Sequence, residues 1–595
     1  MAIDAKFIQS TQEVQERVNG ILMTPKTTKM WKVNEIFRVV EEWMLAHGRF
    51  YSIGKENGSG MAVWLDNETR EVIEISSGGS RFSYMLQLFG IQPSTNESKD
   101  IGKNIGTKFG AKAPANTIYA MSTMKDDALY VNQYDGTMLK ITVVKEVTPG
   151  VPDMVFDPNP EPRVRFVGKV EKLRNGDDDV LFNRSGDPLD CDIEKANGSY
   201  SDGKGRGLNL GGNSLIEKYL LSTVSFAYDE NAMDAATLVE KQGEAAIWGS
   251  QAKQLLCGMI LALYFQEMIR TQFMVLVTGV PGTMKSSLIR SVGKVIIGKD
   301  FNVTPFPKNP DDLVLSAITS GFLGFDETNL TKEHEELLNT ISTGGMDSRR
   351  ELYTTDKMRR KPFQARIWMT GNATETRQES TSSRVFPVDV VRSGVKDAYR
   401  ADDDVERELL ANRDAIWTEI VTRCQNIMAH LASSRERGDW ISHVDHRMSS
   451  FAVWYLNCAR SEGWLDFARM ELAALQKRQQ MQVTDSSSFL DLIDAYMKRS
   501  DGLWRTAAKW SRFLDCFVNE NDTELRRAVA RSGYVANRFK VFESTLKQKY
   551  GMKTRRDGHL KHLEYMFPAN SCGGAVSPQS TSAGMQTTDY VGDDD

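Results

Sequence analysis

One stretch, FMVLVTGVPGTMKSSLIR, constrains the fold of this chain more than any other. It opens with five apolar residues, Phe273 to Val277, a run short enough for a buried strand. A glycine-rich turn follows, and then Lys285 and Ser286 begin a segment whose apolar residues recur at helical spacing. The stretch therefore predicts a strand, a tight turn and a helix in succession, the unit from which parallel α/β sheets are built.

Strand, glycine-rich turn, Lys-Ser and helix together form a P-loop. Backbone N–H groups around Gly279 and Gly282 can wrap a triphosphate only where side chains do not crowd it, and the helix N-terminus adds partial positive charge. Lys285 is expected to reach the β- and γ-phosphates, and Ser286 to ligate Mg²⁺. Met284 departs from the pattern, because it stands where a P-loop has its second glycine. The predicted nucleotide-binding residues are Gly279, Val280, Pro281, Gly282, Thr283, Met284, Lys285, Ser286 and Ser287.

Polar residues stand at the ends of three later apolar runs. The run GFLGFDETN contains Asp326 and Glu327, RIWMTGN ends at Asn372, and Arg384 precedes VFPVDVV. In a P-loop ATPase the first acid holds the metal, the second polarises the attacking water, and a later polar residue holds the same water. We therefore predict a metal site at Ser286 and Asp326, and catalytic roles for Glu327, Asn372 and Arg384, with ATP and Mg²⁺ as cofactors.

This order of motifs resembles the AAA+ ATPases, with Walker A at 279–286, Walker B at 322–327, a sensor at Asn372 and an arginine finger at Arg384. It is similar to minichromosome-maintenance-like and viral superfamily-three-like replicative helicases. The string NTISTGGMDSRRELYTTD is close to a signature of primase-helicase C-terminal ATPases of phages and mobile elements. The resemblance covers roughly residues 215–391.

The resemblance implies an ATP-dependent DNA helicase that couples hydrolysis to translocation on DNA. It implies a homo-oligomeric ring, expected to be a hexamer, with ATP bound between subunits and the arginine finger supplied by the neighbour. The implied partners are single-stranded or forked DNA and a replication loader or primase.

A basic segment lies between the acid pair and the sensor. SRRELYTTDKMRRKPF, residues 348–363, has a short β-like run, a Thr-Asp turn and then four cations: Lys357, Arg359, Arg360 and Lys361. In helicases of this kind a hairpin at this point grips the DNA backbone, whose phosphates need cations but no base reading. We predict DNA contact here, with a solvated charged loop as the alternative. Arg349 and Arg350 are alternatives to Arg384 as the finger.

A second basic region closes the last folded unit. Helical patterns are followed by a hairpin pattern, MKTRRDGHLKHLEYMF, with a turn at Asp557-Gly558. Helices followed by a β-hairpin are typical of a winged helix, and a basic helix and wing indicate DNA binding. A winged helix that docks protein is the alternative. The predicted DNA-binding residues are Arg538, Lys540, Arg555 and Arg556.

At 595 residues the chain is too long for one hydrophobic core. We predict a multidomain α/β fold: an AAA+ P-loop ATPase core with a parallel sheet, preceded by a small α+β domain and followed by a helical lid and a winged helix. The predicted segments are a flexible N-terminus (1–28), an α+β domain (29–148), linker and long loops (149–213), the ATPase core (214–402), a helical lid or extension (403–486), the winged helix (487–568) and a disordered acidic tail (569–595).

Composition excludes several classes of protein. Six scattered cysteines without a CxxC pair indicate free thiols of a reducing compartment, neither a disulfide framework nor a zinc site. The first residues lack the apolar core of a signal peptide, and the longest apolar run is too short to span a bilayer. We therefore expect a cytoplasmic protein that does not use a membrane. The net charge of −5 means that any DNA contact uses local basic patches.

Two other functions remain open at this point. An origin-remodelling initiator or a DNA-packaging ATPase would use the same site without separating strands. A nucleotide-switched DNA-binding assembly module would bind ATP only as a signal. Met284 favours this last alternative, whereas Glu327 argues against it, because a pure switch does not need a carboxylate that activates water.

Overall fold

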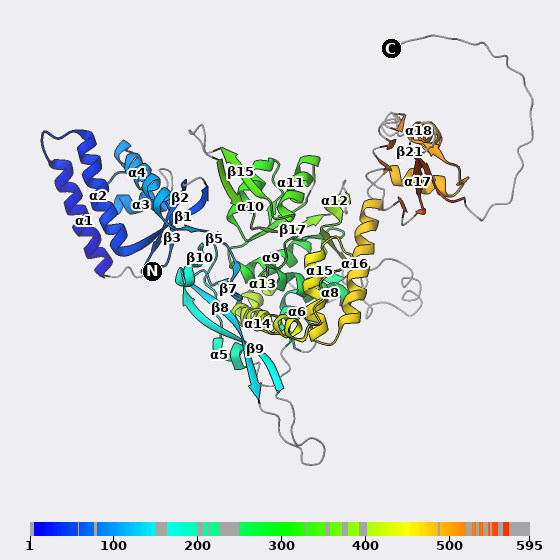
Figure 1. Cartoon of the computed structure of the whole chain (residues 1–595), viewed down its shortest axis with the longest axis horizontal. Coiled ribbons are helices and arrows are strands. Elements are labelled where there is room, and N and C mark those ends of the chain that lie inside the picture. Colours follow the sequence, from blue (N-terminus) through cyan, green and yellow to red (C-terminus); the bar gives the residue numbers. More distant parts are fainter. Residues whose placement is uncertain are drawn as a thin grey trace, which may run out of the picture. The chain divides into compact units, whose positions relative to one another are not determined.

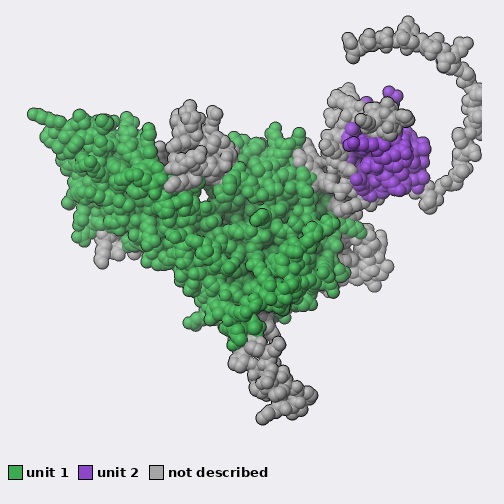
Figure 2. Space-filling view, viewed as in Figure 1, with its two compact units in different colours: residues 1–486 green, residues 487–595 purple. Residues whose placement is uncertain are grey.

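The computed structural model divides the chain into two compact units, Met1–Ser486 and Ser487–Asp595, which Figure 2 shows in separate colours. Each unit is described by itself. No helix in the described ranges combines the length and the apolarity needed to cross a membrane. The described residues are 5–56, 59–75, 80–93, 95–148, 163–198, 206–210, 213–226, 249–328, 330–350, 358–371, 379–391, 402–485, 488–518, 526, 529–530, 535–536, 538–539, 546–547, 550–556 and 563–569.

The first unit begins with a small α+β region that has its own core (Figure 1). Its sheet has the strand order β3-β2-β1-β4, and its helices cover one face of that sheet through residues such as Ile36, Val40 and Ile101. Its elements are α1 (Ala5–Met23), α2 (Lys29–His47), β1 (Gly48–Glu56), β2 (Ser59–Asp66), β3 (Val72–Glu74), α3 (Ser80–Leu88), α4 (Asn96–Lys112) and β4 (Ala115–Asn116).

The expectation of a flexible N-terminus over residues 1–28 is wrong for α1. This helix packs beside α2, and Val14 and Val18 are buried in the same core as Val40. Its apolar face is narrow, and most of the segment is polar, so the sequence pattern alone is weak. The apolar face of α2 supplies the packing surface that stabilises it, as is usual for helices in proteins.

A second sheet follows, an antiparallel meander with the order β6-β7-β8-β9. Its strands are β6 (Ser122–Lys125), β7 (Ala128–Asn132), β8 (Thr137–Thr148) and β9 (Arg163–Arg174). β8 and β9 pair along their whole length, from Thr137 opposite Arg174 to Thr148 opposite Arg163. The prediction of linker and long loops over 149–213 is therefore wrong for 163–174, where a twelve-residue strand is found.

The meander does not form a separate domain with the small α+β region. Leu129, Leu139 and Ile141 lie in one hydrophobic core with Val292 and Ile420, which belong to the helices at 285–296 and 413–437. The predicted domain boundary at residue 148 is therefore not a boundary in the packing. Strands that alternate apolar and polar residues show which face is buried, but not what covers it.

The chain after β9 is also held firmly against the body. Glu462 accepts hydrogen bonds from three successive backbone N–H groups, those of Gly207, Leu208 and Asn209, at 2.7, 2.8 and 2.9 Å. The buried Arg423 donates to the carbonyl groups of Gly207 and Asn209. Residues 207–209 of the predicted linker are therefore fixed to the body, because two buried charged side chains form hydrogen bonds with their backbone groups. The short elements in this region are β5 (Ile118–Tyr119), β10 (Leu181–Phe182), α5 (Ile193–Gly198) and α6 (Leu215–Tyr219).

A six-stranded sheet lies at the centre of the first unit, in the order β11-β18-β12-β17-β14-β13. Every neighbouring pair is parallel except the edge pair of β11 and β18. The strands are β11 (Ser225–Phe226), β12 (Met274–Thr278), β13 (Thr304–Pro305), β14 (Phe322–Asp326), β17 (Arg366–Gly371) and β18 (Val385–Val391). This is the parallel sheet that the alternation of strands and helices predicts.

Helices cover both faces of this sheet, as parallel sheets require. Val275 and Val277 of β12 pack on one side with residues of α8 (Gly249–Ala262) and α9 (Lys285–Ile296). Met274 and Leu276 pack on the other side with residues of α10 (Pro310–Thr319) and α11 (Lys332–Ser342). The result is a three-layer α/β/α body.

The predicted helical segment after the sheet contains α13 (Asp402–Ala411), α14 (Arg413–Arg437), α15 (Ser449–Ser461) and α16 (Leu465–Asp485). Trp417 of α14 and Trp454 of α15 are 1% exposed and lie in the same core as α8 and α9. α14 also packs against β8 and β9. These two helices are thus part of the body, and the helical lid or extension over 403–486 stays a prediction.

The second unit contains α17 (Ser488–Met497), β19 (Arg505–Thr506), α18 (Ala507–Leu514), β20 (Lys553–Arg556) and β21 (Leu563–Met566). Its three strands pair in the order β19-β21-β20, and aromatic rings of Tyr496, Trp510, Phe539 and Phe567 form its core. Helices followed by a hairpin agree with the expected order of elements. The winged helix stays a prediction, because much of 519–549 lies outside the described residues.

The core that the meander shares with α9 and α14 leads to a prediction about the free energy of unfolding. Leu139→Ala is expected to destabilise the α/β/α body by about 2–5 kcal/mol, because it removes a fully buried side chain from the core that α9 and α14 share. Ile101→Ala is the matched control, since Ile101 is equally buried but belongs to the N-terminal core. Thermal unfolding with limited proteolysis should show fragments of α8 to α15 released early only in Leu139→Ala. Early release of N-terminal fragments alone by both variants would contradict the shared core.

Candidate functional site

The turn between β12 and α9 has the backbone shape that the P-loop pattern predicts. Gly279 has a φ of +156° and Gly282 a φ of +82°, conformations that favour glycine. A Cβ atom on Gly279 would lie 2.3 Å from the carbonyl oxygen of Val390 on the neighbouring strand β18. Only glycine therefore lets the turn lie this close to the sheet.

Met284 takes the left-handed conformation that glycine would take there, with φ 61° and ψ 22°. It stands at the N-cap of α9, and its carbonyl oxygen accepts the first helical hydrogen bond, from the backbone N–H of Leu288 at 3.0 Å. An L-residue is strained in this conformation. Met284 therefore adopts the left-handed backbone at the position where the pattern has its second glycine, and its backbone is strained there.

Lys285 lies over the turn. Its Nζ atom donates to the carbonyl oxygens of Gly279 at 2.6 Å and Val280 at 3.2 Å. Burial lowers the pKa of Lys285, while the carboxylates of Asp326 and Glu327 oppose that shift by favouring its charge. The ammonium group thus lies between the turn and the acid pair, where phosphate oxygens could replace the carbonyl groups as its partners.

Ser286 and Asp326 meet at the carboxyl edge of the sheet. The Ser286 hydroxyl, on the first turn of α9, donates to Oδ1 of Asp326, the last residue of β14, at 2.9 Å. A hydroxyl and a carboxylate are hard oxygen ligands, which Mg²⁺ prefers. In the described part of the chain no group of three or more His, Cys, Asp or Glu side chains could hold a metal. A Mg²⁺ ion here would complete its coordination with phosphate and water oxygens, as Mg²⁺ usually does.

Thr370, which the sequence analysis did not select, holds the acid pair in place. It lies on β17, which runs between β12 and β14, and its hydroxyl donates to Oδ1 of Asp326. The hydroxyl oxygen of Thr370 also accepts a hydrogen bond from the backbone N–H of Glu327 at 3.1 Å. The Thr370 carbonyl oxygen accepts one from the backbone N–H of Thr328 at 3.0 Å. The sequence contains a signal for this role, since Thr370 is a polar residue near the end of β17 and follows the apolar run Ile367 to Met369.

Glu327 follows β14 in a left-handed conformation, with a φ of 48°. Such strain in a non-glycine residue persists only where the surroundings fix it, and it concentrates at functional sites. Here the backbone N–H of Glu327 donates to both Asp326 and Thr370 at 3.1 Å. The side chain is exposed beside Asp326, so its carboxylate is accessible to water.

A further ion pair supports the other side of the turn. Asp389 near the end of β18 accepts a hydrogen bond from the Thr278 hydroxyl at 2.6 Å. It also accepts from Nε of Arg478 on α16, at 3.0 Å. The residue just before the P-loop glycine is therefore linked to a helix about two hundred residues later in the chain. Nothing in the local pattern of Asp389 or Arg478 indicates this contact.

Arg384 lies in the turn between α12 (Glu379–Ser382) and β18, and it points inward. It is 9% exposed, and its Nη1 atom donates to Oδ1 of Asn339 at 3.2 Å and to the carbonyl oxygen of Ser380. Burial lowers the pKa of this guanidinium, and Arg447 lowers it further. Its Nε atom has no hydrogen-bond partner among the described residues. In this conformation the guanidinium is not displayed to a neighbouring subunit.

Some of the other predicted site residues are described by the structure and some are not. Asn372, Lys357 and Lys540 lie outside the described residues. The predicted hairpin is present, because β15 (Met346–Arg350) pairs antiparallel with β16 (Met358–Pro362). Arg359, Arg360 and Lys361 occupy β16, the second strand of that hairpin. In the second unit Arg538 is described at a helical position, and Arg555 and Arg556 lie on β20.

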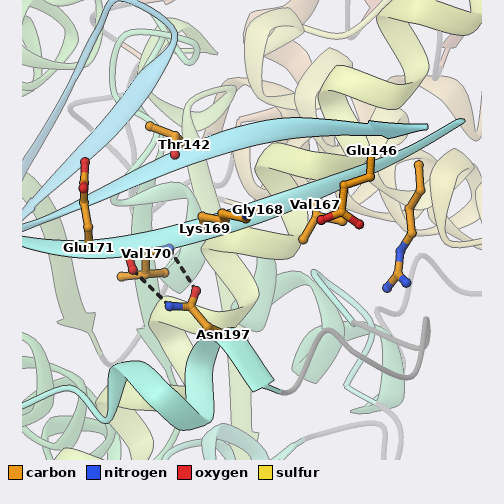
Figure 3. Close-up of a pocket in the computed structure, with 9 residues that line it drawn as sticks. Thr142, Glu146, Val167, Gly168, Lys169, Val170, Glu171 and Asn197 are labelled. Carbon is orange, nitrogen blue, oxygen red and sulfur yellow. Dashed lines mark hydrogen bonds between the residues drawn. The ribbon is translucent and has the colours of Figure 1, made fainter. Parts of the chain in front are cut away.

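A hollow of about 540 Å³ lies along β8 and β9 (Figure 3). The side-chain amide of Asn197 bonds there to both the N–H and the carbonyl of Val170, each at 3.0 Å, as a neighbouring strand would. None of the predicted site residues lines this hollow. We therefore assign it no part in the candidate site.

Comparisons with known proteins add little to this site. A scan against protein-family models finds no match, and a search of curated proteins finds none. Among solved structures the chain is similar to the apo A form of the NrS-1 C-terminal region, with a TM-score of 0.35, 11% identity and coverage of 89% of this chain and 97% of that one. It is also similar to the SCCmec type IV Cch active helicase, with a TM-score of 0.38, 9% identity and coverage of 88% and 94%. TM-scores this low do not support a function, so we infer the function from the site alone.

The strain at Met284 can be measured. Met284→Gly is expected to be more stable than Met284→Ala by about 1 kcal/mol, because glycine relieves the left-handed backbone, less its own entropy cost, and alanine does not. Both variants lose the same side-chain packing, so alanine is the matched control. Thermal unfolding of the two proteins tests this. Equal stabilities would mean that residue 284 is not left-handed in solution.

Proposed function

We propose that this protein is an ATP-dependent DNA helicase that works as a ring. The observation that carries the proposal is the contact between Ser286 and Asp326 at 2.9 Å, beside Lys285 and Glu327. It joins a phosphate-binding turn to an acid pair on a different strand. A site for a nucleoside triphosphate with its Mg²⁺ needs both the turn and the acid pair, whereas a turn that only stabilises the fold needs no acid pair beside it.

The topology of the sheet supports a nucleotide at this place. β12 has β17 and β18 as its neighbours, while β13 and β14, which follow β12 in sequence, lie beyond β17. The chain therefore places later strands on both sides of β12, which makes its carboxyl end a topological switch point. Ligands of open α/β sheets bind outside the carboxyl ends of strands at such a point.

The residues of the site divide the chemistry of hydrolysis among them. Lys285 would leave the carbonyl groups of the turn and neutralise β- and γ-phosphate oxygens. Ser286 and Asp326 would hold Mg²⁺, which neutralises charge that develops on the transferred phosphoryl group. Glu327, exposed and fixed by its backbone hydrogen bonds, would orient the attacking water. Asn372, just beyond the described end of β17, would hold the same water.

Arg384 is our proposed arginine finger, acting on the nucleotide of a neighbouring subunit. Its described hydrogen-bond partners, Asn339 and the carbonyl group of Ser380, are neutral, and its buried Nε atom has none. A buried guanidinium with no anionic partner among the described residues is costly, so an anion offered across an interface would favour an outward rotamer. The subunit would then be inactive alone and active in a closed ring.

The hairpin β15–β16 is proposed to contact DNA, and β17 would connect it to the site. β16 ends at Pro362 and β17 begins at Arg366, while Thr370 near the far end of β17 holds the acid pair. A short, fully buried strand thus links the proposed DNA contact and the proposed water-activating residue. A shift at one end would be transmitted to the other, because packed strands move as rigid elements.

Strand displacement on a forked DNA with ATP tests the proposal most directly. The wild-type protein should unwind the fork, and Glu327→Gln should bind ATP but leave the fork intact, because the glutamine cannot activate water. Hydrolysis of ATP without unwinding would favour an initiator or a packaging motor. Binding of ATP without hydrolysis by the wild type would favour a nucleotide-switched assembly module.

The role of Thr370 gives an independent prediction. Thr370→Val keeps the shape of the side chain but removes the hydrogen bonds to Asp326 and to the N–H of Glu327. We expect turnover of ATP to fall about tenfold to a hundredfold, the effect of misplacing a catalytic group slightly, with little change in ATP binding. Thr370→Ser is the control, since it keeps the hydroxyl and should keep most of the rate. Normal turnover by Thr370→Val would remove Thr370 from the site.

A further inference from the structure

The three-stranded sheet of the second unit has one face in the core and one face turned outward. Tyr565 of β21 is 6% exposed and lies against the ring of Phe539, 4.4 Å between centroids. Side chains alternate along a strand, so Glu564 and its cross-strand partner Arg555 lie on the opposite, outward face. Lys553, two residues before Arg555, lies on the outward face too and is exposed.

On this outward face Arg555 contacts two other side chains, those of Trp504 and Glu564. Arg555 reaches across the middle strand β21, and its guanidinium carbon lies 4.4 Å from the centre of the Trp504 ring. Its Nε and Nη2 atoms both approach one carboxylate oxygen of Glu564, at 2.9 and 2.8 Å. Glu564 is only 13% exposed, whereas Arg555 is 54% exposed. The carboxylate therefore fixes the position of the guanidinium, and the ring supports it from one side.

We propose that this stack of Trp504 and Arg555 is a binding platform for an unpaired base of single-stranded DNA. A guanidinium plane or an aromatic ring stacks on the flat face of a base, and inside a duplex the stacked neighbours of a base cover both of its faces. Lys553 supplies a cation for the neighbouring phosphate. The inference deepens the proposed function, because it takes DNA as the ligand, and it gives Arg555 a stacking role where the sequence indicated only a charge.

The arrangement favours single strands over duplex for a physical reason. Arg555 is held by Glu564, so its charge is largely compensated before DNA arrives. A site built only to attract the phosphates of a duplex gains nothing from a carboxylate beside its arginine. A stacking site gains a guanidinium that is already oriented, which reduces the entropy lost on binding.

The test measures binding of the full-length protein, without nucleotide, to a fluorescently labelled oligo-dT and to a blunt duplex of equal length. Arg555→Lys keeps the charge but removes the plane, and it should weaken oligo-dT binding about fivefold or more while duplex binding changes less than about twofold. Trp504→Ala should do the same, and Trp504→Phe should fall between it and the wild type. Arg512→Lys, at an exposed arginine of α18, is the matched control and should change neither affinity.

Two further readouts keep the test decisive. Trp504→Ala can weaken binding by unfolding the second unit, which circular dichroism would show. In that case Arg555→Lys, a change at the surface, decides whether the platform binds oligo-dT. Oligonucleotides that contain 5-iododeoxyuridine should cross-link on irradiation to the peptide that contains Trp504, and Arg555→Lys should reduce the yield. Equal losses for oligo-dT and duplex, or none, would overturn the platform. These assays contain no ATP, so they can succeed although unwinding fails, and they can fail although unwinding succeeds.

Discussion

The arrangement of the candidate site depends on one interaction, the hydrogen bonds that Thr370 makes to the acid pair beside it. Parallel pairing aligns β17 with β14, so a hydroxyl near the end of one strand meets a carboxylate at the end of the other. Glu327 then leaves β14 in a strained conformation that the same hydroxyl stabilises. Lys285 and Ser286 approach from β12, on the other side of β17. The site is therefore built by the sheet, and the loops only complete it.

Much of this could be predicted from the sequence because the signals are local. The P-loop turn, the strand with the acid pair and the hairpin before β17 each depend on a few neighbouring residues, such as Gly279 and Asp326. The left-handed Met284 shows the limit of that reasoning. Its position in the pattern is visible in the sequence, but only the backbone shows that methionine adopts the glycine conformation.

What could not be predicted depends on contacts between distant parts of the chain. The polar helix α1 becomes stable by packing on α2, and β9 becomes a long strand because β8 is there to pair with it. Arg384 was expected at an interface, but its guanidinium turns toward Asn339, and a pattern of residue types carries no rotamer. Arg478 meets Asp389 across about ninety residues for the same reason: sequence spacing holds no information about which helix covers which strand end.

The core that the meander shares with the P-loop helix limits how this chain can be divided. A chain of separable modules could lose or exchange any one of them, because few contacts cross each boundary. Most of the region up to β4 packs in its own core, although Val63 and Leu65 pack with Leu181. From β6 onward Leu129 and Ile141 pack with Val292 of α9, the helix that follows the predicted P-loop turn. The smallest unit around the predicted P-loop that can fold alone therefore includes a β-sheet that lies well before it in the sequence. Removing the meander would therefore expose the core on which the helices beside the turn pack.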